Sequence, residues 1–151
     1  MMRLTDHFTL DELTQSETAA RRGIANTPSP AIVESLTRTA QTLEQVRTLL
    51  GSCPVLVSSG YRSPALNAAV GGSATSAHVQ GLAADFFCPG FGSPLDICRK
   101  IAASGIAFDQ LIFEGTWVHL GLGVVGQKPR NQVLTAHFGG GVTRYDTGLQ
   151  P

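Results

Sequence analysis

The sequence predicts an α+β fold in which a small antiparallel sheet packs against helices. Three Ser-Pro pairs each mark a helix start, because serine caps a helix and proline suits its first turn. Short segments rich in β-branched and aromatic residues lie between these helices. Two of them, 110–113 and 117–120, are joined by Glu114-Gly115-Thr116, a short glycine-containing link that is typical of a β-hairpin. The hairpin implies antiparallel strands, and the fold class follows.

Four helices are predicted from start and stop signals. The first begins at Leu10, where Thr9 and Glu12 form a capping box. The other three each follow a Ser-Pro pair and end at glycine, running from Pro30 to Gly51, from Pro64 to Gly71 and from Pro94 to Gly105.

Five strands are predicted at 55–59, 83–88, 110–113, 117–120 and, more weakly, 132–138. The run Gly139-Gly140-Gly141 indicates a turn near the C-terminal end.

Composition favours one domain, residues 1–151, with one ordinary core, since 42% of the residues are hydrophobic. Eleven basic residues balance eleven acidic ones, which argues against a nucleic acid partner. No apolar run is long enough to span a membrane, and the start lacks the apolar segment of a signal peptide. We therefore expect a soluble monomer that is cytoplasmic as synthesised. The three cysteines have no zinc-site spacing and are expected to pack as reduced, small apolar residues.

Two of the four histidines have neighbours that indicate chemistry. His78 stands seven residues before Asp85, in a loop that leads into a strand, and Gly81 gives that loop the freedom to bend. His119 lies in an otherwise apolar strand, where an unpaired polar group costs free energy unless something binds it. A single histidine is more often an ordinary hydrogen-bonding residue than a metal ligand, so the combination matters.

Three blocks together resemble the zinc D-Ala-D-Ala carboxypeptidases and peptidoglycan endopeptidases of the hedgehog/DD-peptidase fold, which include phage endolysins. The blocks are 59–64, Ser76 to Asp85, and Trp117-Val118-His119, and the resemblance extends over almost the whole chain. It implies that His78, Asp85 and His119 bind one Zn²⁺. Two imidazoles and a carboxylate with an open fourth position are typical of catalytic zinc sites, whereas structural sites favour closed, cysteine-rich sets.

The resemblance also implies that Arg62 receives a carboxylate of the substrate, a task that suits the two-pronged guanidinium. Ser76 is a candidate substrate contact, although an ordinary turn hydroxyl is an equal reading. Trp117 shares a strand face with His119 and is expected to wall the site, although a tryptophan of the core is equally compatible with the sequence.

The general base is where the chain departs from several relatives. These carry an acid three residues before the second histidine, and here that residue is Thr116. Glu114, on the same hairpin, is the nearest acid and our candidate for the base, with Asp109 as the alternative. Either carboxylate is also compatible with a solvated turn.

These observations together predict a zinc-dependent peptidase that cleaves stem peptides of bacterial peptidoglycan, as a D-Ala-D-Ala carboxypeptidase or an endopeptidase. A phage or prophage endolysin, which meets the wall after lysis, through a holin or from a phage particle, is the expected setting. The alternative is a zinc-bearing but non-catalytic wall-binding or phage structural module.

Overall fold

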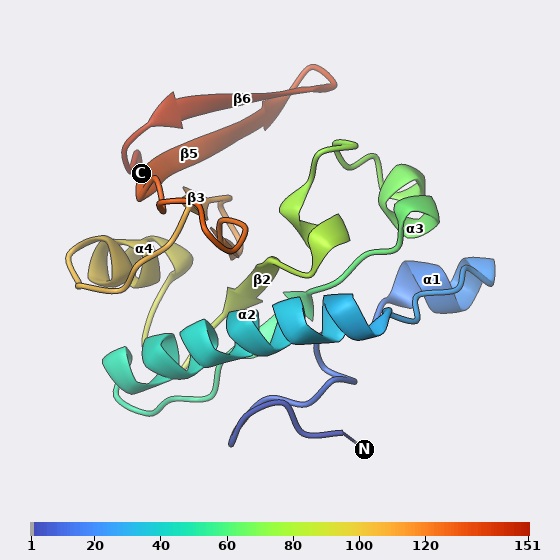
Figure 1. Cartoon of the computed structure of the whole chain (residues 1–151). Coiled ribbons are helices and arrows are strands. Elements are labelled where there is room, and N and C mark those ends of the chain that lie inside the picture. Colours follow the sequence, from blue (N-terminus) through green and yellow to red (C-terminus); the bar gives the residue numbers. More distant parts are fainter. Residues whose placement is uncertain (1) are drawn as a thin grey trace.

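The computed structural model describes residues 2–151 and has the predicted α+β class (Figure 1). Over these residues it contains four α-helices: α1 (Glu17–Arg22), α2 (Pro30–Leu49), α3 (Pro64–Ala69) and α4 (Pro94–Ala102). A short 3₁₀ helix, η1 (Ala77–Gln80), precedes the second strand. The strands are β1 (Leu56–Ser59), β2 (Ala83–Phe87), β3 (Gln110–Phe113), β4 (Val118–Gly121), β5 (Gln132–Gly139) and β6 (Val142–Thr147).

The six strands form one sheet in the order β1-β2-β4-β3-β5-β6. Every neighbouring pair is antiparallel except β3 and β5, which are parallel. The antiparallel expectation is therefore correct for four of the five pairs and wrong for this one. A parallel pair needs a long crossover, here through β4 and the segment that follows it, and such pairing leaves no local signal in the sequence.

One face of the sheet packs against α2 and α4. The strands contribute buried apolar side chains to this core, and the helices contribute theirs at helical spacing; the set includes Val57, Phe86, Leu111, Leu120, Leu36, Leu43, Val46, Ile97 and Ile101. Successive residues of a strand point to opposite faces. Asp85, which stands between the core residues Ala84 and Phe86, and His119, which stands between Val118 and Leu120, therefore belong to the other face.

This other face is free of α2 and α4 and carries the candidate site. A small apolar cluster of Ile112, Leu134 and Ala136 lies on it, beside the polar residues. The hairpin of β5 and β6 continues the sheet well away from α2 (Figure 1). The sheet thus has one face that packs into the main core and one face that carries the candidate site.

The three Ser-Pro helix starts are confirmed. The side chains of Ser29, Ser63 and Ser93 each accept a hydrogen bond from a backbone amide three residues further on. At Ser93 the capping box is complete, because Asp96 bonds back to the amide of Ser93.

The helix predicted from Leu10 is wrong. The capping box of Thr9 and Glu12 forms its hydrogen bonds, but the chain makes only a turn there. The carbonyl of Leu13 accepts from the amide of Tyr61, and that of Thr14 accepts from the side chain of Asn26. Neither carbonyl is left to bond an amide four residues further on, so the helix does not propagate. A separate helix, α1, begins instead after its N-cap Ser16.

The five predicted strands are confirmed within a residue or two, whereas β6 was not predicted. Five of its six residues are exposed, and its polar and charged side chains show no apolar face to betray a strand. The cysteines are free thiols as expected, and Cys88 and Cys98 are buried. Within residues 2–151 no helix has the length and apolar character needed to cross a membrane.

Candidate metal centre

The register of the sheet brings two of the three predicted ligands together. Asp85 on β2 is the direct partner of His119 on β4. Their side chains meet on the open face, where Nδ1 of His119 lies 2.9 Å from Oδ1 of Asp85. Because backbone hydrogen bonds between β2 and β4 hold both strands in place, the side chains of Asp85 and His119 are preorganised.

The third predicted ligand, His78, lies on η1. Ser76 caps this 3₁₀ helix by accepting a hydrogen bond from the amide of His78, and Gly81 ends it with φ of 71°. The predicted bend at Gly81 is thus confirmed, and it leads the chain directly into β2. The His78 and His119 rings then stand edge to face with centroids 5.1 Å apart.

The protonation of His78 can be read from its partners. Its Nδ1 lies 2.7 Å from the carbonyl oxygen of Gly60, and since a carbonyl only accepts, Nδ1 carries the proton. Nε2 is left with a lone pair in a side chain that is 3% exposed, and no group among residues 2–151 gives it a hydrogen bond. Metal-binding histidines usually have this arrangement. One ring nitrogen donates a hydrogen bond to a carbonyl, and the other is buried without a hydrogen-bond partner and is free to bind the metal.

Spacing and charge also suit a cation. The ligand atoms of His78, Asp85 and His119 lie within 4.8 Å of one another, so this group could hold a metal ion. Nε2 of His78 is 3.4 Å from Oδ2 of Asp85. This is close to the distance of about 3.3–3.6 Å expected between two ligand atoms of a tetrahedral zinc ion. Burial acts to raise the pKa of Asp85, but the two adjacent histidines, His119 with its hydrogen bond above all, outweigh it and hold that pKa well below its usual range. Asp85 is therefore an anion.

Glu114, the residue directly after β3, points its carboxylate toward these three residues. Oε2 lies 3.9 Å from Nδ1 of His119 and accepts a hydrogen bond of 3.1 Å from the indole of Trp117. Burial raises the pKa of Glu114, and the nearby charge of Asp85 adds to the effect. The hairpin thus brings an acid to the cavity from two positions before Thr116.

Asp109, the other candidate base, has a different partner. Its two carboxylate oxygens accept hydrogen bonds of 2.9 and 2.7 Å from the guanidinium of Arg130. These bonds hold the pKa of Asp109 below its usual value. Asp109 borders the same cavity, but this ion pair ties up its carboxylate.

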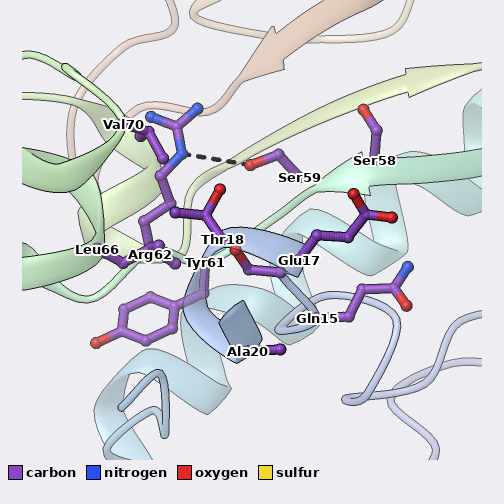
Figure 2. A pocket seen from close by; sticks show the side chains of 11 residues that line it. Gln15, Glu17, Thr18, Ala20, Ser58, Ser59, Tyr61, Arg62, Leu66 and Val70 are labelled. Atoms are coloured by element: carbon purple, nitrogen blue, oxygen red, sulfur yellow. Dashed lines mark hydrogen bonds between the residues drawn. The ribbon is translucent and has the colours of Figure 1, made fainter. Parts of the chain in front are cut away.

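Arg62 is held beside the candidate ligands by three contacts. Its guanidinium donates to the hydroxyl of Ser59 at 3.3 Å and to the side-chain oxygen of Asn67 at 3.1 Å, and it lies 3.6 Å from Asp85. Asn67, which is buried in α3, was not predicted as a partner of Arg62, because no local pattern marks it. Arg62 also borders a second cavity of about 700 Å³, in which Ser58 and Glu17 line the side away from it (Figure 2).

A cavity of about 600 Å³ opens over the candidate ligands and unites the predicted residues. Its walls include all the sequence candidates, namely His78, Asp85, His119, Arg62, Glu114, Asp109, Ser76 and Trp117. Trp117 is half-buried and faces Phe138 with ring centroids 6.1 Å apart, so it is no part of the main core. Two further wall residues, Phe138 and Tyr145, come from the β5–β6 hairpin and were not predicted.

Comparison with known proteins agrees with this geometry. No match was found among curated proteins. A protein-family model described as Peptidase M15 matches residues 6–121, which include η1, β2 and β4 with their histidines and aspartate. Because the match covers well over half of the 151 residues, the chain belongs to the peptidase M15 family.

Proposed function

We propose that this protein is a zinc-dependent peptidase that hydrolyses peptide bonds in the stem peptides of bacterial peptidoglycan. The observation that carries the proposal is the buried, unpartnered Nε2 of His78, aimed at the carboxylate that His119 also contacts. Membership of the peptidase M15 family supports the same chemistry.

His78, Asp85 and His119 would hold the zinc ion. Two neutral imidazoles and one carboxylate leave such a site with a net charge of about +1. When bound, zinc supplies Lewis-acid activation of the scissile carbonyl and of water. The carbonyl of Gly60 keeps the proton on Nδ1 of His78, which leaves Nε2 as the donor atom.

Glu114 acts as the general base in this proposal. It takes a proton from the attacking water and passes it to the amine that leaves. Its raised pKa suits the first step, because a more basic carboxylate takes the proton of water more readily, and the carboxylic acid so formed is still acidic enough to protonate the leaving amine. The indole of Trp117 fixes the carboxylate in position.

Arg62 binds a carboxylate of the stem peptide, and Ser59 and Asn67 orient its guanidinium. Two parallel hydrogen bonds from Arg62 to a carboxylate would place the scissile bond over the metal group, by which we mean His78, Asp85 and His119. Ser76 caps η1 and thereby positions His78, and its place on the cavity wall supports a substrate contact as well.

The test is digestion of purified peptidoglycan by the zinc-loaded protein, with new amine termini as the readout. We expect release by the wild type, none by Glu114→Gln with zinc still bound, and loss of both activity and zinc in His119→Ala. Protein that pellets with the wall but releases no amine would contradict a peptidase and favour a non-catalytic wall-binding or phage structural module. Mass spectrometry of the products identifies the bond cut and separates carboxypeptidase from endopeptidase action.

The predicted role as a phage or prophage endolysin has its own test. Co-expression of the protein with a holin should lyse cells, and Glu114→Gln should not. Intact cells in both cultures would refute that role without affecting the peptidase assignment.

A further inference from the structure

The order of the strands lays out the cavity along one direction. Arg62 follows β1, the candidate ligands Asp85 and His119 lie on β2 and β4, and Glu114 directly follows β3. Beyond them come β5 and then β6 at the edge of the sheet. The cavity wall thus runs from a carboxylate-binding residue, across the metal group, to the β5–β6 hairpin.

This hairpin presents an apolar side to the cavity. Tyr145 is the direct partner of Ala136, so both lie on the face that carries Leu134 and Phe138. Leu134, Phe138 and Tyr145 line the cavity with the candidate ligands. The hairpin follows the segment that matches the family model, which ends at residue 121.

Two of these side chains, Phe138 and Tyr145, are more exposed than is usual for aromatic residues. Phe138 is 57% and Tyr145 52% exposed, although aromatic rings gain most when buried. Phe138 has a neighbour in Trp117, and together the three rings form an aromatic wall. The hydroxyl of Tyr145 makes no hydrogen bond to any residue from 2 to 151 and keeps its proton, since burial and the charges of Glu114 and Asp85 raise the pKa of the phenol.

We propose that this aromatic wall, Trp117, Phe138 and Tyr145, binds the part of the stem peptide on the amino side of the scissile bond. This inference rests on the proposed function, in which Arg62 takes a carboxylate on the opposite side of the metal group. Three strand spacings separate β4 from β6, about 14 Å in a sheet. An extended chain covers that span with about four residues. The rings cover backbone and small side chains, and the Tyr145 hydroxyl donates to a peptide carbonyl.

The consequence is a preference for long substrates, which a series of synthetic stem peptides tests. The peptides share one scissile bond and grow by one residue at a time on the amino side. Their affinities for zinc-loaded Glu114→Gln protein are measured by calorimetry, and kcat/KM is measured with the active enzyme. We expect both affinity and kcat/KM to rise with length.

In the double variant Phe138→Ser/Tyr145→Ser the gain with length should fall by about tenfold or more, while the shortest peptide is unaffected. Both side chains are half exposed, so their loss leaves the core intact. The matched control is Val142→Ser, a 73% exposed residue of the same hairpin that does not line the cavity.

An unchanged length dependence in the double variant would overturn the inference, and so would an equal loss at every length. A loss confined to intact peptidoglycan would assign the wall to the glycan strand and also overturn it. Length-dependent binding that the double variant loses, in a protein that hydrolyses no peptide, would support the aromatic wall and refute the proposed peptidase.

Discussion

Asp85 and His119 face each other across neighbouring strands, with Oδ1 of the carboxylate 2.9 Å from Nδ1 of the imidazole. The contact depends on the pairing of β2 with β4, which is also what packs Phe86 and Val118 into the core on the reverse side of the sheet. The strand pairing that forms this part of the core therefore also brings two of the three candidate ligands together.

Asp85→Asn should weaken zinc binding by at least the ~10–100-fold that loss of a supporting group causes, because it removes an anionic donor. The fold should survive, since the amide keeps the shape of the carboxylate. Competition with a chelator of known affinity measures the change. Asp109→Asn is the matched control, as its carboxylate borders the same cavity but binds Arg130. Equal zinc affinities for the Asp85 variant and the wild type would rule Asp85 out as a ligand.

Removal of zinc should lower the stability of the wild type. A ligand present at a hundred times its dissociation constant adds about 2.7 kcal/mol to the free energy of unfolding if it binds only the folded state. Urea unfolding with zinc and with a chelator measures this difference. His119→Ala should show almost none, and a stabilisation by zinc that persists in this variant would place the metal elsewhere.

Glu114→Gln should stabilise the metal-free protein at neutral pH. An acid whose pKa is raised in the folded state binds more protons folded than unfolded, so its contribution to stability falls as the pH rises through the usual pKa of 4.5 and above it. Glutamine removes that penalty while keeping the shape. The midpoint in urea should therefore be higher for the variant at neutral pH, and the difference should disappear under acid conditions.

The opposite result for Glu114→Gln, a lower midpoint at neutral pH, would mean that the carboxylate is held by favourable partners. The hydrogen bond from the Trp117 indole would then outweigh burial and the repulsion from Asp85.

Arg62→Lys should lower kcat/KM without loss of zinc. The ammonium keeps the charge but lacks the fork that binds both oxygens of a carboxylate. Loss of a hydrogen bond to a charged group costs about 1.5–3 kcal/mol, or roughly 10- to 160-fold in kcat/KM. Steady-state kinetics on stem peptides with a carboxylate, compared with their amidated forms, isolates the effect. Wild-type and variant enzymes that discriminate equally between the two forms would show that Arg62 has another role.

Ser93→Ala should destabilise the protein by about 1 kcal/mol, because it removes the cap of α4 and half of its capping box. Ser93→Gly should cost only a few tenths, since glycine suits the cap position. Urea unfolding compares the two. A larger loss for glycine than for alanine would show that the backbone at Ser93 needs restraint more than the helix needs its cap.

The sequence predicted those elements whose signals are local. Ser29-Pro30, Ser63-Pro64 and Ser93-Pro94 carry both cap and first turn within a few residues, and each helix formed. The helix expected at Leu10 failed for a long-range reason, because Tyr61 and Asn26 bind the carbonyls it needed. Residues so distant along the chain leave no trace in a local pattern.

The candidate site divides in the same way. Its ligand residues stand in blocks that can be recognised along the chain, whereas the choice between Glu114 and Asp109 depends on neighbours in space. Arg130 lies 21 residues from Asp109 and pairs with it, and this leaves Glu114 as the carboxylate turned toward His119. Tyr145 escaped prediction because β6 has no apolar face of its own and gains meaning only beside β5.

Because the two faces of the sheet differ, the register of its strands decides both whether the core packs and whether the candidate site forms. If β4 slipped by one residue, His119 would turn into the apolar interior and Val118 or Leu120 would turn out over the metal group. Such a chain would lose the metal group and, at the same time, expose a row of apolar side chains. Molecules with the slipped register should therefore be inactive and also sensitive to proteases. A molecule that folds with a packed core should accordingly also have the site.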